Sequence, residues 1–328
     1  MTEPRVSVLI PTYNRAAYLR EAIGSALGQT FRDIEVVIVD DGSTDGTAKI
    51  VREITDPRVR YLWQANHGVA AALNTAWHAA RGEYLARLDS DDVWLPDLLA
   101  QFIATLDADP GLGLVYARAQ WMDAQGNLLP QILGAPEKFP GQWLKSLLYG
   151  DFVCPIAVMF RRTCIERAGG YDESLIGNED WDLWIRMAEH CRFAYRNQIL
   201  ARYRVHAQNL TSSVSEQSLR LFSDRIRVLE KFFARSDVPA EVLAIKPLAF
   251  RNVYLDIAMR HFTARHWHDG FDYSLRAIRV GPNLLTSAMR VITAACFYFY
   301  LSKTRWGVRL VDALIERRRK TDRVSQSH

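Results

Sequence analysis

The sequence has little cysteine and none of the cysteine spacing that binds metals locally. Its 328 residues include four cysteines, and no two of them form a CxxC pair. A zinc finger or a local redox motif is therefore not indicated. Because disulfides are rare inside cells, we expect reduced thiols in a cytosolic protein, serving mainly as small core residues. The four are Cys154, Cys164, Cys191 and Cys296.

Signals for export and for a membrane span are also missing. The first residues, MTEPRVSVLIPTYN, have no charged region followed by an apolar segment and a cleavage site, so secretion is not expected. The apolar stretch Leu284 to Leu301 is interrupted by Arg290 and falls short of the roughly 20 residues that a spanning helix needs. It predicts either a buried helix or a peripheral contact with anionic lipid, through Phe297 to Tyr300 and the basic cluster Arg317 to Lys320.

Outside the C-terminal segment, neither basic nor acidic residues are in clear excess. The formal net charge is +4, and positions 303 to 323 carry eight Lys or Arg against three Asp or Glu. No zinc finger and no strand-borne aromatic RNA motif accompanies these basic residues, so a nucleic-acid partner is not indicated. The GxxxxGK[ST] loop is absent, as is a GxGxxG after the first apolar run, which excludes a common NTPase or dinucleotide site.

The first half does contain a regular alternation of short apolar runs and helical patterns. The runs VSVLI, IEVVIVD, VRYLW and EYLARLD predict strands at 6–10, 34–40, 59–63 and 83–89. Helices are predicted between them, and a further helix from Pro96 toward Asp107. This alternation predicts an α/β fold with a mostly parallel, Rossmann-type sheet flanked by helices.

The rest of the chain divides into a mixed section and a helical one. Gly111 to Arg204 contains the runs LGLVYAR and CPIAVMFRR, and Trp121 to Gly150 is predicted to be a long irregular segment of the kind that is commonly functional. From Ser215 the pattern is helical, and the polar NLTSSVSE suggests a boundary near Ser213. We therefore expect a domain at 1–213, with halves 1–110 and 111–213, and a helical extension at 214–328.

Residue types that bind ligands follow each of the first four predicted strands. In open α/β sheets the ligand crevice lies outside the carboxyl ends of the strands, so these positions predict one binding rim. In strand order they are Thr12, Tyr13 and Asn14; Asp40, Asp41 and Ser43; Asn66, His67 and Gly68; and Asp89, Ser90 and Asp91.

The stretch LDSDD at 88–92 places three aspartates within four positions. Asp92 alone could be explained by the first turn of a helix, but Asp89 and Asp91 together call for a compensating cation. Mg²⁺ or Mn²⁺ takes carboxylate oxygens and typically binds a diphosphate as well. In VDDGSTDGT, a turn followed by a helix cap explains 42–45 equally well, whereas Asp41 stands where a base could bind.

Three segments, at 6–47, 66–97 and 169–188, together resemble glycosyltransferase family 2, whose members have the GT-A fold. The resemblance covers roughly residues 5 to 210. It implies an inverting transfer of a sugar from a nucleotide diphosphate to an acceptor hydroxyl, in polysaccharide or cell-envelope glycan synthesis. The implied partners are a nucleotide-sugar donor, UDP-linked by preference with dTDP and GDP left open, and a carbohydrate or lipid-linked acceptor.

The resemblance also assigns roles. Thr12 and Tyr13 would line the base pocket, Asp41 would accept the imide N–H of uracil, Asp89 would lie near the ribose and Asp91 on Mn²⁺ or Mg²⁺. The full set expected to contact the donor is Pro11, Thr12, Tyr13, Asp41, Asn66, Gly68, Asn74, Asp89 and Ser90. The expected metal ligands are Asp89, Asp91 and His206, and the expected catalytic pair is Asp180, the general base, with its neighbour Glu179. The chain departs from the family at Leu73, where many relatives have arginine.

Several alternatives stay open. Asp180 could merely cap the helix that follows it, and His206 could be an ordinary packing histidine. A sugar-1-phosphate nucleotidyltransferase would share the sheet and the metal, but it should have a Gly-rich loop with a basic residue where this chain has PTYNR. A non-catalytic carbohydrate-binding scaffold would have the same fold without turnover.

Overall fold

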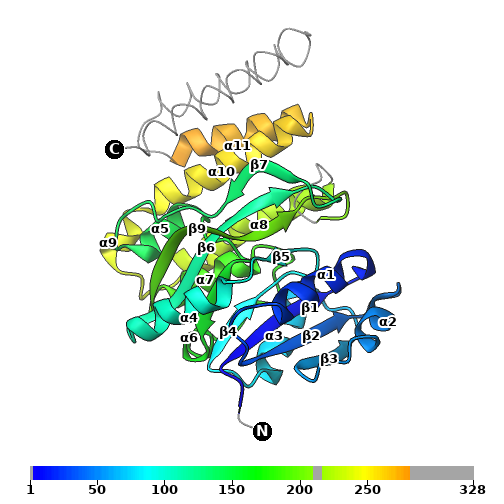
Figure 1. Cartoon of the computed structure of the whole chain (residues 1–328). Coiled ribbons are helices and arrows are strands. Elements are labelled where there is room, and N and C mark those ends of the chain that lie inside the picture. The colour runs from blue at the N-terminus through cyan, green and yellow to red at the C-terminus, as the bar shows by residue number, and fades with distance from the viewer. Residues whose placement is uncertain (1–2, 210–215, 281–328) are drawn as a thin grey trace. The chain divides into compact units, whose positions relative to one another are not determined.

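The computed structural model describes residues 3–209 and 216–280, which fall into two compact units (Figure 1). The first unit contains the described residues up to 209 together with Arg220–Ile245. The second contains 216–219 and, from Lys246, the rest of the described chain. The apolar stretch at 284–301, the basic cluster at 317–320 and Cys296 lie outside the described residues. The division at 213 stays a prediction.

The first unit is built on one curled sheet of nine strands, in the order β3-β2-β1-β4-β8-β6-β9-β5, with β7 paired to β6 (Figure 1). The four N-terminal strands of this path pair in parallel, as do β6 and β9, while β5, β7 and β8 pair antiparallel. The expected α/β class with a mostly parallel, helix-flanked sheet is confirmed. The strands are β1 (Val6–Thr12), β2 (Ile34–Asp41), β3 (Val59–Gln64), β4 (Tyr84–Arg87), β5 (Val93–Trp94), β6 (Leu112–Met122), β7 (Leu128–Leu133), β8 (Val158–Arg161) and β9 (Arg192–Arg204).

Strands β1 and β2 are buried along their whole length, which is why they read as continuous apolar runs rather than as alternating patterns. Their register places Thr12 beside Asp40, so both strands end at the same level. Helices connect the strands: α1 (Ala16–Leu27), α2 (Thr47–Arg52), α3 (Val69–Ala79) and α4 (Leu98–Ala108). Helix α4 begins after the cap residue Asp97, slightly later than the predicted start at Pro96.

The amino-terminal edge of the sheet is closed by a buried charge cluster. Glu35 is 2% exposed and accepts hydrogen bonds from Ser7, Arg60 and Arg81. Burial alone would raise the pKa of Glu35, but these hydrogen bonds hold the pKa below its ordinary value. A Cβ at Gly82 would lie 2.6 Å from the Ser7 amide nitrogen, so only glycine fits there. This edge is therefore structural, and the opposite edge is available for a ligand.

The segment from Trp121 to Gly150 is more regular than we predicted. Strand β6 continues to Met122 and forms a hairpin with β7, and helix α5 (Trp143–Tyr149) follows. The sequence obscured β7 because Pro130 lies in it, and proline is tolerated in a strand that has a neighbour on one side. Helices α6 (Arg162–Ala168) and α7 (Glu179–Met187) complete this half.

The expectation of reduced cysteines is wrong for one pair. Cys164 at α6 and Cys191 after α7 form a disulfide, which the absence of a local CxxC spacing could not reveal because their pairing depends on the packing of two helices. Cys154 is a free, buried thiol, as expected of a small core residue.

The region after 215 is helical throughout its described part. It contains α8 (Glu216–Phe233), α9 (Ala240–Leu243), α10 (Lys246–Thr263) and α11 (Trp267–Val280). Within the described residues, no helix combines the length and apolar character needed to cross a membrane.

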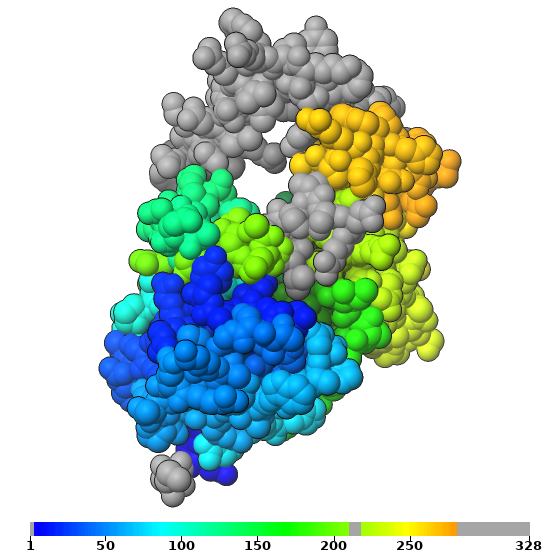
Figure 2. Space-filling view, turned by 90° about the vertical axis from the view of Figure 1, so that its right-hand side faces the viewer, coloured from blue at the N-terminus to red at the C-terminus, as the bar shows by residue number. Residues whose placement is uncertain are grey.

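Figure 2 shows that in the first unit the blue and cyan surface of the N-terminal half continues into green surface of the later half.

Candidate active site

The loops after β1 and β2 are bound to each other at the carboxyl edge of the sheet. Asn14 has a left-handed backbone (φ 51°), and its amide N–H donates to Ser43 Oγ at 2.9 Å. Its side-chain oxygen accepts the Thr44 N–H at 2.8 Å. Asparagine is one of the few residues that adopt this backbone conformation readily. The predicted meeting of two strand ends at one rim is therefore found.

The turn-and-cap interpretation holds for Asp45. One of its carboxylate oxygens accepts the N–H of Ala16 at the start of α1, and the other accepts the N–H of Thr47 at the start of α2. Burial would raise the pKa of Asp45, but the hydrogen bonds from Thr47 and Ala16 lower it. Asp45 thus caps two helices.

Asp41 is buried and orders the loop that leads into α3. Its Oδ1 accepts from Gln64 Nε2 at 2.7 Å and from the His67 N–H at 3.0 Å, and its Oδ2 accepts from the Gly68 N–H at 2.8 Å. An ionised carboxylate offers about four acceptor positions. These three donors therefore leave one acceptor position of Asp41 unused.

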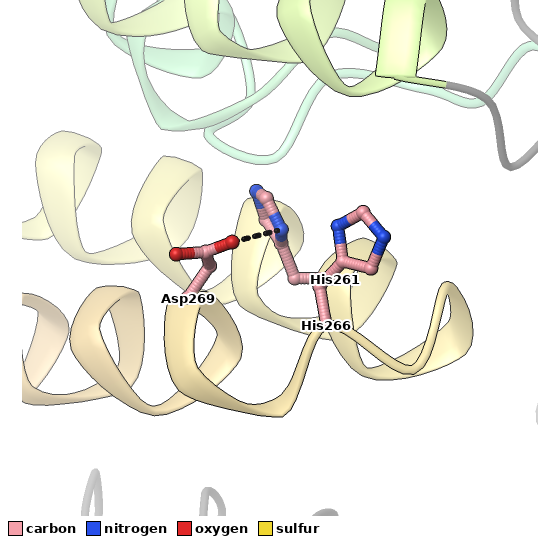
Figure 3. Close-up of side chains that lie close together, drawn as sticks. All are labelled: His261, His266 and Asp269. Carbon is pink, nitrogen blue, oxygen red and sulfur yellow. Dashed lines mark ion pairs between the residues drawn. The ribbon is translucent and has the colours of Figure 1, made fainter.

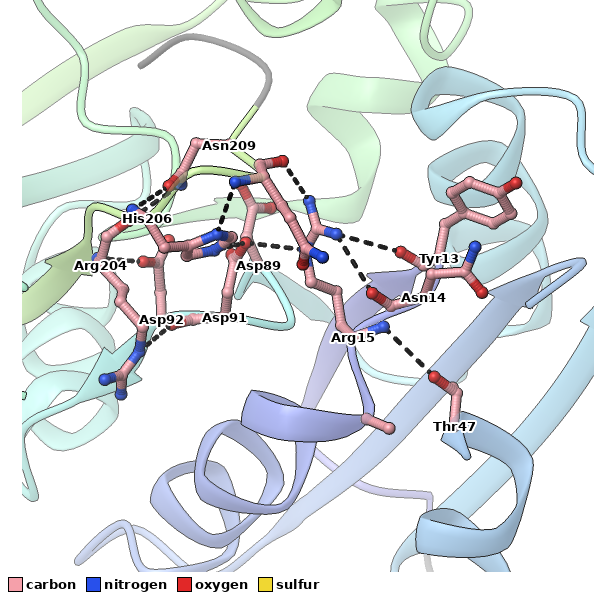
Figure 4. A network of polar contacts seen from close by, with 12 residues as sticks. Tyr13, Asn14, Arg15, Thr47, Asp89, Asp91, Asp92, Arg204, His206 and Asn209 are labelled. Carbon is pink, nitrogen blue, oxygen red and sulfur yellow. Dashed lines mark hydrogen bonds and ion pairs between the residues drawn. The ribbon is translucent and has the colours of Figure 1, made fainter. Parts of the chain in front are cut away.

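Asp91 is the point where three distant segments meet (Figure 4). Its Oδ2 accepts from Arg15 Nε and lies 3.0 Å from His206 Nε2, just beyond the end of β9. Burial would raise the pKa of Asp91, but the His206 hydrogen bond and the charge of Arg15 lower it below its ordinary value. Asp91 is thus held ionised in a site that is 9% exposed.

His206 is fixed in orientation by its surroundings. The Gln208 N–H donates to His206 Nδ1 at 3.2 Å, which leaves Nε2 to face Asp91. Tyr18 stacks on the ring with centroids 4.8 Å apart. The Asn209 side chain, also buried, bonds both the His206 N–H and the Arg204 carbonyl. His206 therefore packs in the core and also presents a nitrogen to the rim.

Asp91 and His206 are residue types that bind divalent cations. The 3.0 Å between Asp91 Oδ2 and His206 Nε2 is a hydrogen-bond distance: Nδ1 accepts the Gln208 N–H, so Nε2 carries the proton and would ligate a metal only after that proton moves to Nδ1. Asp89 is not part of this pair, because its carboxylate is bound by both Nε and Nη2 of Arg87. Among the described residues, the three predicted metal ligands do not form one cluster.

Asp92 has a different role from its neighbours. It is 1% exposed, its Oδ1 accepts the Arg204 N–H at 2.7 Å, and its Oδ2 has no hydrogen-bond partner in the described chain. Burial, followed by the charges of Asp91 and Asp89, raises the pKa of Asp92 well above its ordinary value. The proposed helix-turn explanation is wrong, because α4 begins only at Leu98; Asp92 instead anchors the end of β9 through the Arg204 N–H.

The acidic pair Glu179 and Asp180 opens helix α7. Asn178, the cap residue, has φ 60°, and its side chain is held by the Leu221 carbonyl and by Arg225 Nε, both on α8. Asp180 lies one residue inside the helix and accepts the neighbouring Trp181 N–H, so it is not the cap residue. The first helix of the extension thus positions the predicted catalytic pair.

Glu179 and Asp151 share a crowded acidic environment. Burial and then the charge of Asp180 raise the pKa of Glu179 to about 7, although Arg87 Nη1 bonds its Oε1 at 3.0 Å. The same two causes raise the pKa of Asp151 to about 7. Asp151 Oδ1 has no hydrogen-bond partner in the part of the chain that the structure describes. We did not identify Asp151 from the sequence, because it belongs to no local motif.

The remaining predicted donor contacts differ in how they are placed. Thr12 is buried with Oγ1 unpartnered among the described residues, and Tyr13 is 46% exposed at the rim. The side chain of Asn74 makes two hydrogen bonds as donor and two as acceptor, with Tyr171, Glu173 and Trp77. In this conformation it has no position left for a nucleotide sugar. Of the others, Pro11 and Ser90 are buried, Asn66 and Gly68 are exposed, and Leu73 is buried in α3.

Arg15 is a further site residue that sequence reasoning missed. It stands in the PTYNR segment directly after β1, where a basic residue beside a predicted phosphate site could have been noticed. Besides Asp91, it binds the Gln208 carbonyl at 2.9 Å and thereby links the first loop to the end of β9. The rim therefore includes the guanidinium group of Arg15.

Comparison with known sequences and structures places these residues in context. Residues 7–168 match the family described as Glycosyl transferase family 2. Chondroitin synthase of Escherichia coli is 34% identical over 208 residues, which is 63% of this chain and 30% of that enzyme. An uncharacterized glycosyltransferase of Rickettsia prowazekii is 33% identical over 224 residues, which is 65% of this chain and 68% of that protein.

Two solved structures share the fold at low sequence identity. TarS 1-349 of S. aureus in complex with UDP-GlcNAc has a TM-score of 0.63 and 19% identity, covering 90% of both chains. The mannosyltransferase PcManGT from Pyrobaculum calidifontis, in complex with GDP-Man and Mn²⁺, has a TM-score of 0.60 and 23% identity, covering 96% of this chain and 87% of that one.

Proposed function

The chain belongs to glycosyltransferase family 2, and on that premise we propose that it transfers a sugar, with inversion, from a nucleotide diphosphate to an acceptor hydroxyl. Family membership makes it a glycosyltransferase of the GT-A fold and removes the nucleotidyltransferase alternative. The matched part spans only 30% of the chondroitin synthase, so substrates and setting are part of the proposal.

One observation carries the proposal: Asp91, His206 and Arg15 converge at the carboxyl edge of the sheet. They come from three segments, and each is a residue type that binds a divalent ion or a phosphate. Mn²⁺ or Mg²⁺ would be held by Asp91 and His206, and when bound it would neutralise charge on the leaving diphosphate. Arg15 lies close enough to contribute a second positive charge.

The chain's own residues divide the remaining chemistry. Asp180 is partly exposed at the start of α7, and we assign it the removal of the acceptor proton. Glu179 is 5% exposed and hydrogen-bonded to Arg87, so it is the less accessible of the two carboxylates. Arg87 also binds Asp89, and it therefore fixes the distance between the donor rim and the catalytic pair.

The donor base would lie between Tyr13, Thr12 and the remaining acceptor position of Asp41. An acceptor at this position suits the N–H of uracil, which favours a UDP-sugar; thymine and guanine offer similar edges. Thermal-shift measurements with UDP, dTDP and GDP, each with Mn²⁺ or Mg²⁺, test this, because a ligand that binds the folded state raises the melting temperature. The largest shift is expected for UDP with metal, and no shift with any nucleotide would contradict the proposal.

Polysaccharide or envelope glycan synthesis in the cytoplasm is the proposed setting, with peripheral membrane contact through the C-terminal segment. Flotation with anionic liposomes tests that contact; salt-sensitive binding is expected, and its absence would leave the buried-helix alternative.

A non-catalytic scaffold would bind the donor without releasing sugar, so slow hydrolysis of the donor separates it from an enzyme.

A further inference from the structure

The turn between α10 and α11 gathers three side chains of metal-binding type (Figure 3). The ligand atoms of His261, His266 and Asp269 all lie within 4.8 Å of one another. In the described part of the chain this is the single group of three or more such residues. It lies in the second unit, whereas the donor rim lies in the first, so the proposed sugar transfer does not account for it.

The backbone brings the two histidines together. Two residues after α10 ends, Arg265 has the left-handed conformation (φ 64°), and its N–H bonds the Phe262 carbonyl. The His266 N–H bonds the His261 carbonyl at 2.9 Å, which completes a Schellman motif. That motif commonly places an apolar contact between the two positions joined by the longer bond. Here both positions are histidines, with ring centroids 5.9 Å apart.

The same turn positions the carboxylate. His266 precedes the first residue of α11, and its carbonyl accepts the Gly270 N–H at 3.0 Å. Asp269 therefore lies in the first turn of α11, on a helix whose start is fixed by His266. All three residues are thus held by backbone hydrogen bonds or helical geometry, and only side-chain rotation is left to close a site.

The contacts inside the group are not those of a completed hydrogen-bond network. His261 is 8% exposed, and its Nδ1 has no hydrogen-bond partner among the described residues. Asp269 Oδ2 lies 3.6 Å from that nitrogen, which is too long for a hydrogen bond. Two ligands on one tetrahedral Zn²⁺, at about 2.0–2.1 Å from the ion, are about 3.3 Å apart. The observed spacing is therefore closer to that of two metal ligands than to that of a bonded pair.

The exposure of the group suits a site that an ion can enter. His261 is buried and stacked on Tyr273, with centroids 5.4 Å apart, so its ring is held in place. His266 and Asp269 are exposed and can move the short distance that coordination requires. His268 is 98% exposed and lies near the other oxygen of Asp269, at 3.5 Å, outside the three-residue group.

We propose that His261, His266 and Asp269 form a binding site for a divalent transition-metal ion, with Zn²⁺ as the best-suited member of that class. Two imidazole nitrogens and one carboxylate oxygen form a donor set that zinc sites use, with water in the fourth position. The ion would join the end of α10 to the start of α11. Because three protein ligands leave one position open, binding should be reversible and sensitive to chelators.

The test is calorimetric titration of Zn²⁺ into the full-length, chelator-treated protein. Wild type should bind one more Zn²⁺ than His266→Ala, or bind it at least 10- to 100-fold more tightly, since even residues that only support a ligand cost that much. Asp269→Asn should behave like His266→Ala. Both side chains are exposed, so neither change should unfold the protein, and far-ultraviolet circular dichroism checks this.

The control is His190→Ala, which removes an exposed histidine from the first unit and should leave the titration unchanged. Wild type should also melt at a higher temperature with Zn²⁺ than without it, and the two site variants should lose that increment. Equal Zn²⁺ binding by wild type and both site variants would overturn the proposal. So would an equal loss in His190→Ala, because binding would then belong to surface histidines in general.

Discussion

Two groups of carboxylates in the first unit have opposite electrostatic surroundings. At the donor rim, Asp91 faces an arginine and a histidine, and its pKa is lowered. At the start of α7, Glu179 and Asp151 lie beside Asp180, and the pKa of each is raised to about 7. His206 and Arg15 outweigh burial at Asp91, whereas at Glu179 burial and the charge of Asp180 outweigh the cation Arg87.

Arg87 joins the two regions. It is 4% exposed and binds Asp89 on the rim side and Glu179 on the catalytic side. Burial would lower the pKa of Arg87, but these carboxylates raise it well above its ordinary value. A guanidinium can bind two carboxylates in fixed geometry, which an ammonium cannot. Either region can therefore be altered by a substitution that keeps Arg87.

The largest effect is expected from Asp180→Asn, which removes the proposed proton acceptor from the catalytic region. Transfer should fall by roughly 10²- to 10⁴-fold, the contribution of a positioned acid or base. Asparagine keeps the size of the side chain and can still accept the Trp181 N–H, so UDP affinity and melting temperature should stay close to wild type. Rates measured with the physiological acceptor, or donor hydrolysis as a proxy, give the comparison.

Wild-type transfer by Asp180→Asn would remove Asp180 from the catalytic assignment and leave the donor rim untouched. A parallel loss of UDP binding would show that the two regions are not separable.

The second prediction concerns the rim and uses adjacent residues as a matched pair. Asp91→Asn removes an ionised carboxylate, so Mn²⁺-dependent UDP affinity should fall at least 10- to 100-fold. Burial and the charges of Asp91 and Asp89 raise the pKa of Asp92, which favours its neutral form, and an asparagine oxygen can accept the same Arg204 N–H. The Mn²⁺-dependent UDP affinity of Asp92→Asn should therefore stay near wild type. Calorimetry with UDP, with and without Mn²⁺, measures both.

Equal losses in the two variants would mean that the rim depends on the shape of the 89–92 loop rather than on the charge of Asp91.

The smallest effect is expected in stability. The pKa of Asp151 is about 7 in the folded protein and close to 3.8 when unfolded, so the unfolded state releases the proton first. Stability is therefore lost as pH rises from about 4 to 7. Asp151→Asn removes that loss and should raise the melting temperature at pH 8 by at least roughly 2–4 °C, the shift that about 1 kcal/mol produces in a domain of this size.

The increase in melting temperature from Asp151→Asn should be smaller at pH 5 than at pH 8, since at pH 5 wild-type Asp151 is protonated in the folded state. Calorimetric melts at both pH values test this, and an equal gain at both would show that charge is not the cause.

Local patterns were sufficient to predict the first half of the fold. Buried strands such as β1 and β2 form continuous apolar runs, and the polar residues after them meet at one rim because parallel strands end together. The β6–β7 hairpin was missed because Pro130 interrupts its second strand. The disulfide of Cys164 and Cys191 was missed because it depends on packing between helices.

Site residues could be predicted where they lie in one short sequence motif. They could not be predicted where residues from distant segments contact each other. Asp91, His206 and the acidic pair at 179–180 were identified from motifs, and their roles stay predictions. Arg225 was out of reach, because it supports Asn178 from a helix beyond the predicted domain boundary. The pairing of Asp89 with Arg87 depends on side-chain orientation, which a sequence pattern does not specify.

The long separation between the partners at the rim sets an order of assembly during synthesis. Asp91 and His206 are 115 residues apart, and Arg15 and Gln208 are 193 apart, whereas β1 to β4 all lie within the first 87 residues. Contacts between nearby segments form before those that close a long loop. A chain interrupted before His206 already contains Arg15 and the residues proposed for the base pocket, Thr12, Tyr13 and Asp41, but it lacks the His206 partner of Asp91. Because the proposed metal site needs His206, metal-dependent UDP binding during refolding should appear later than binding of uridine alone.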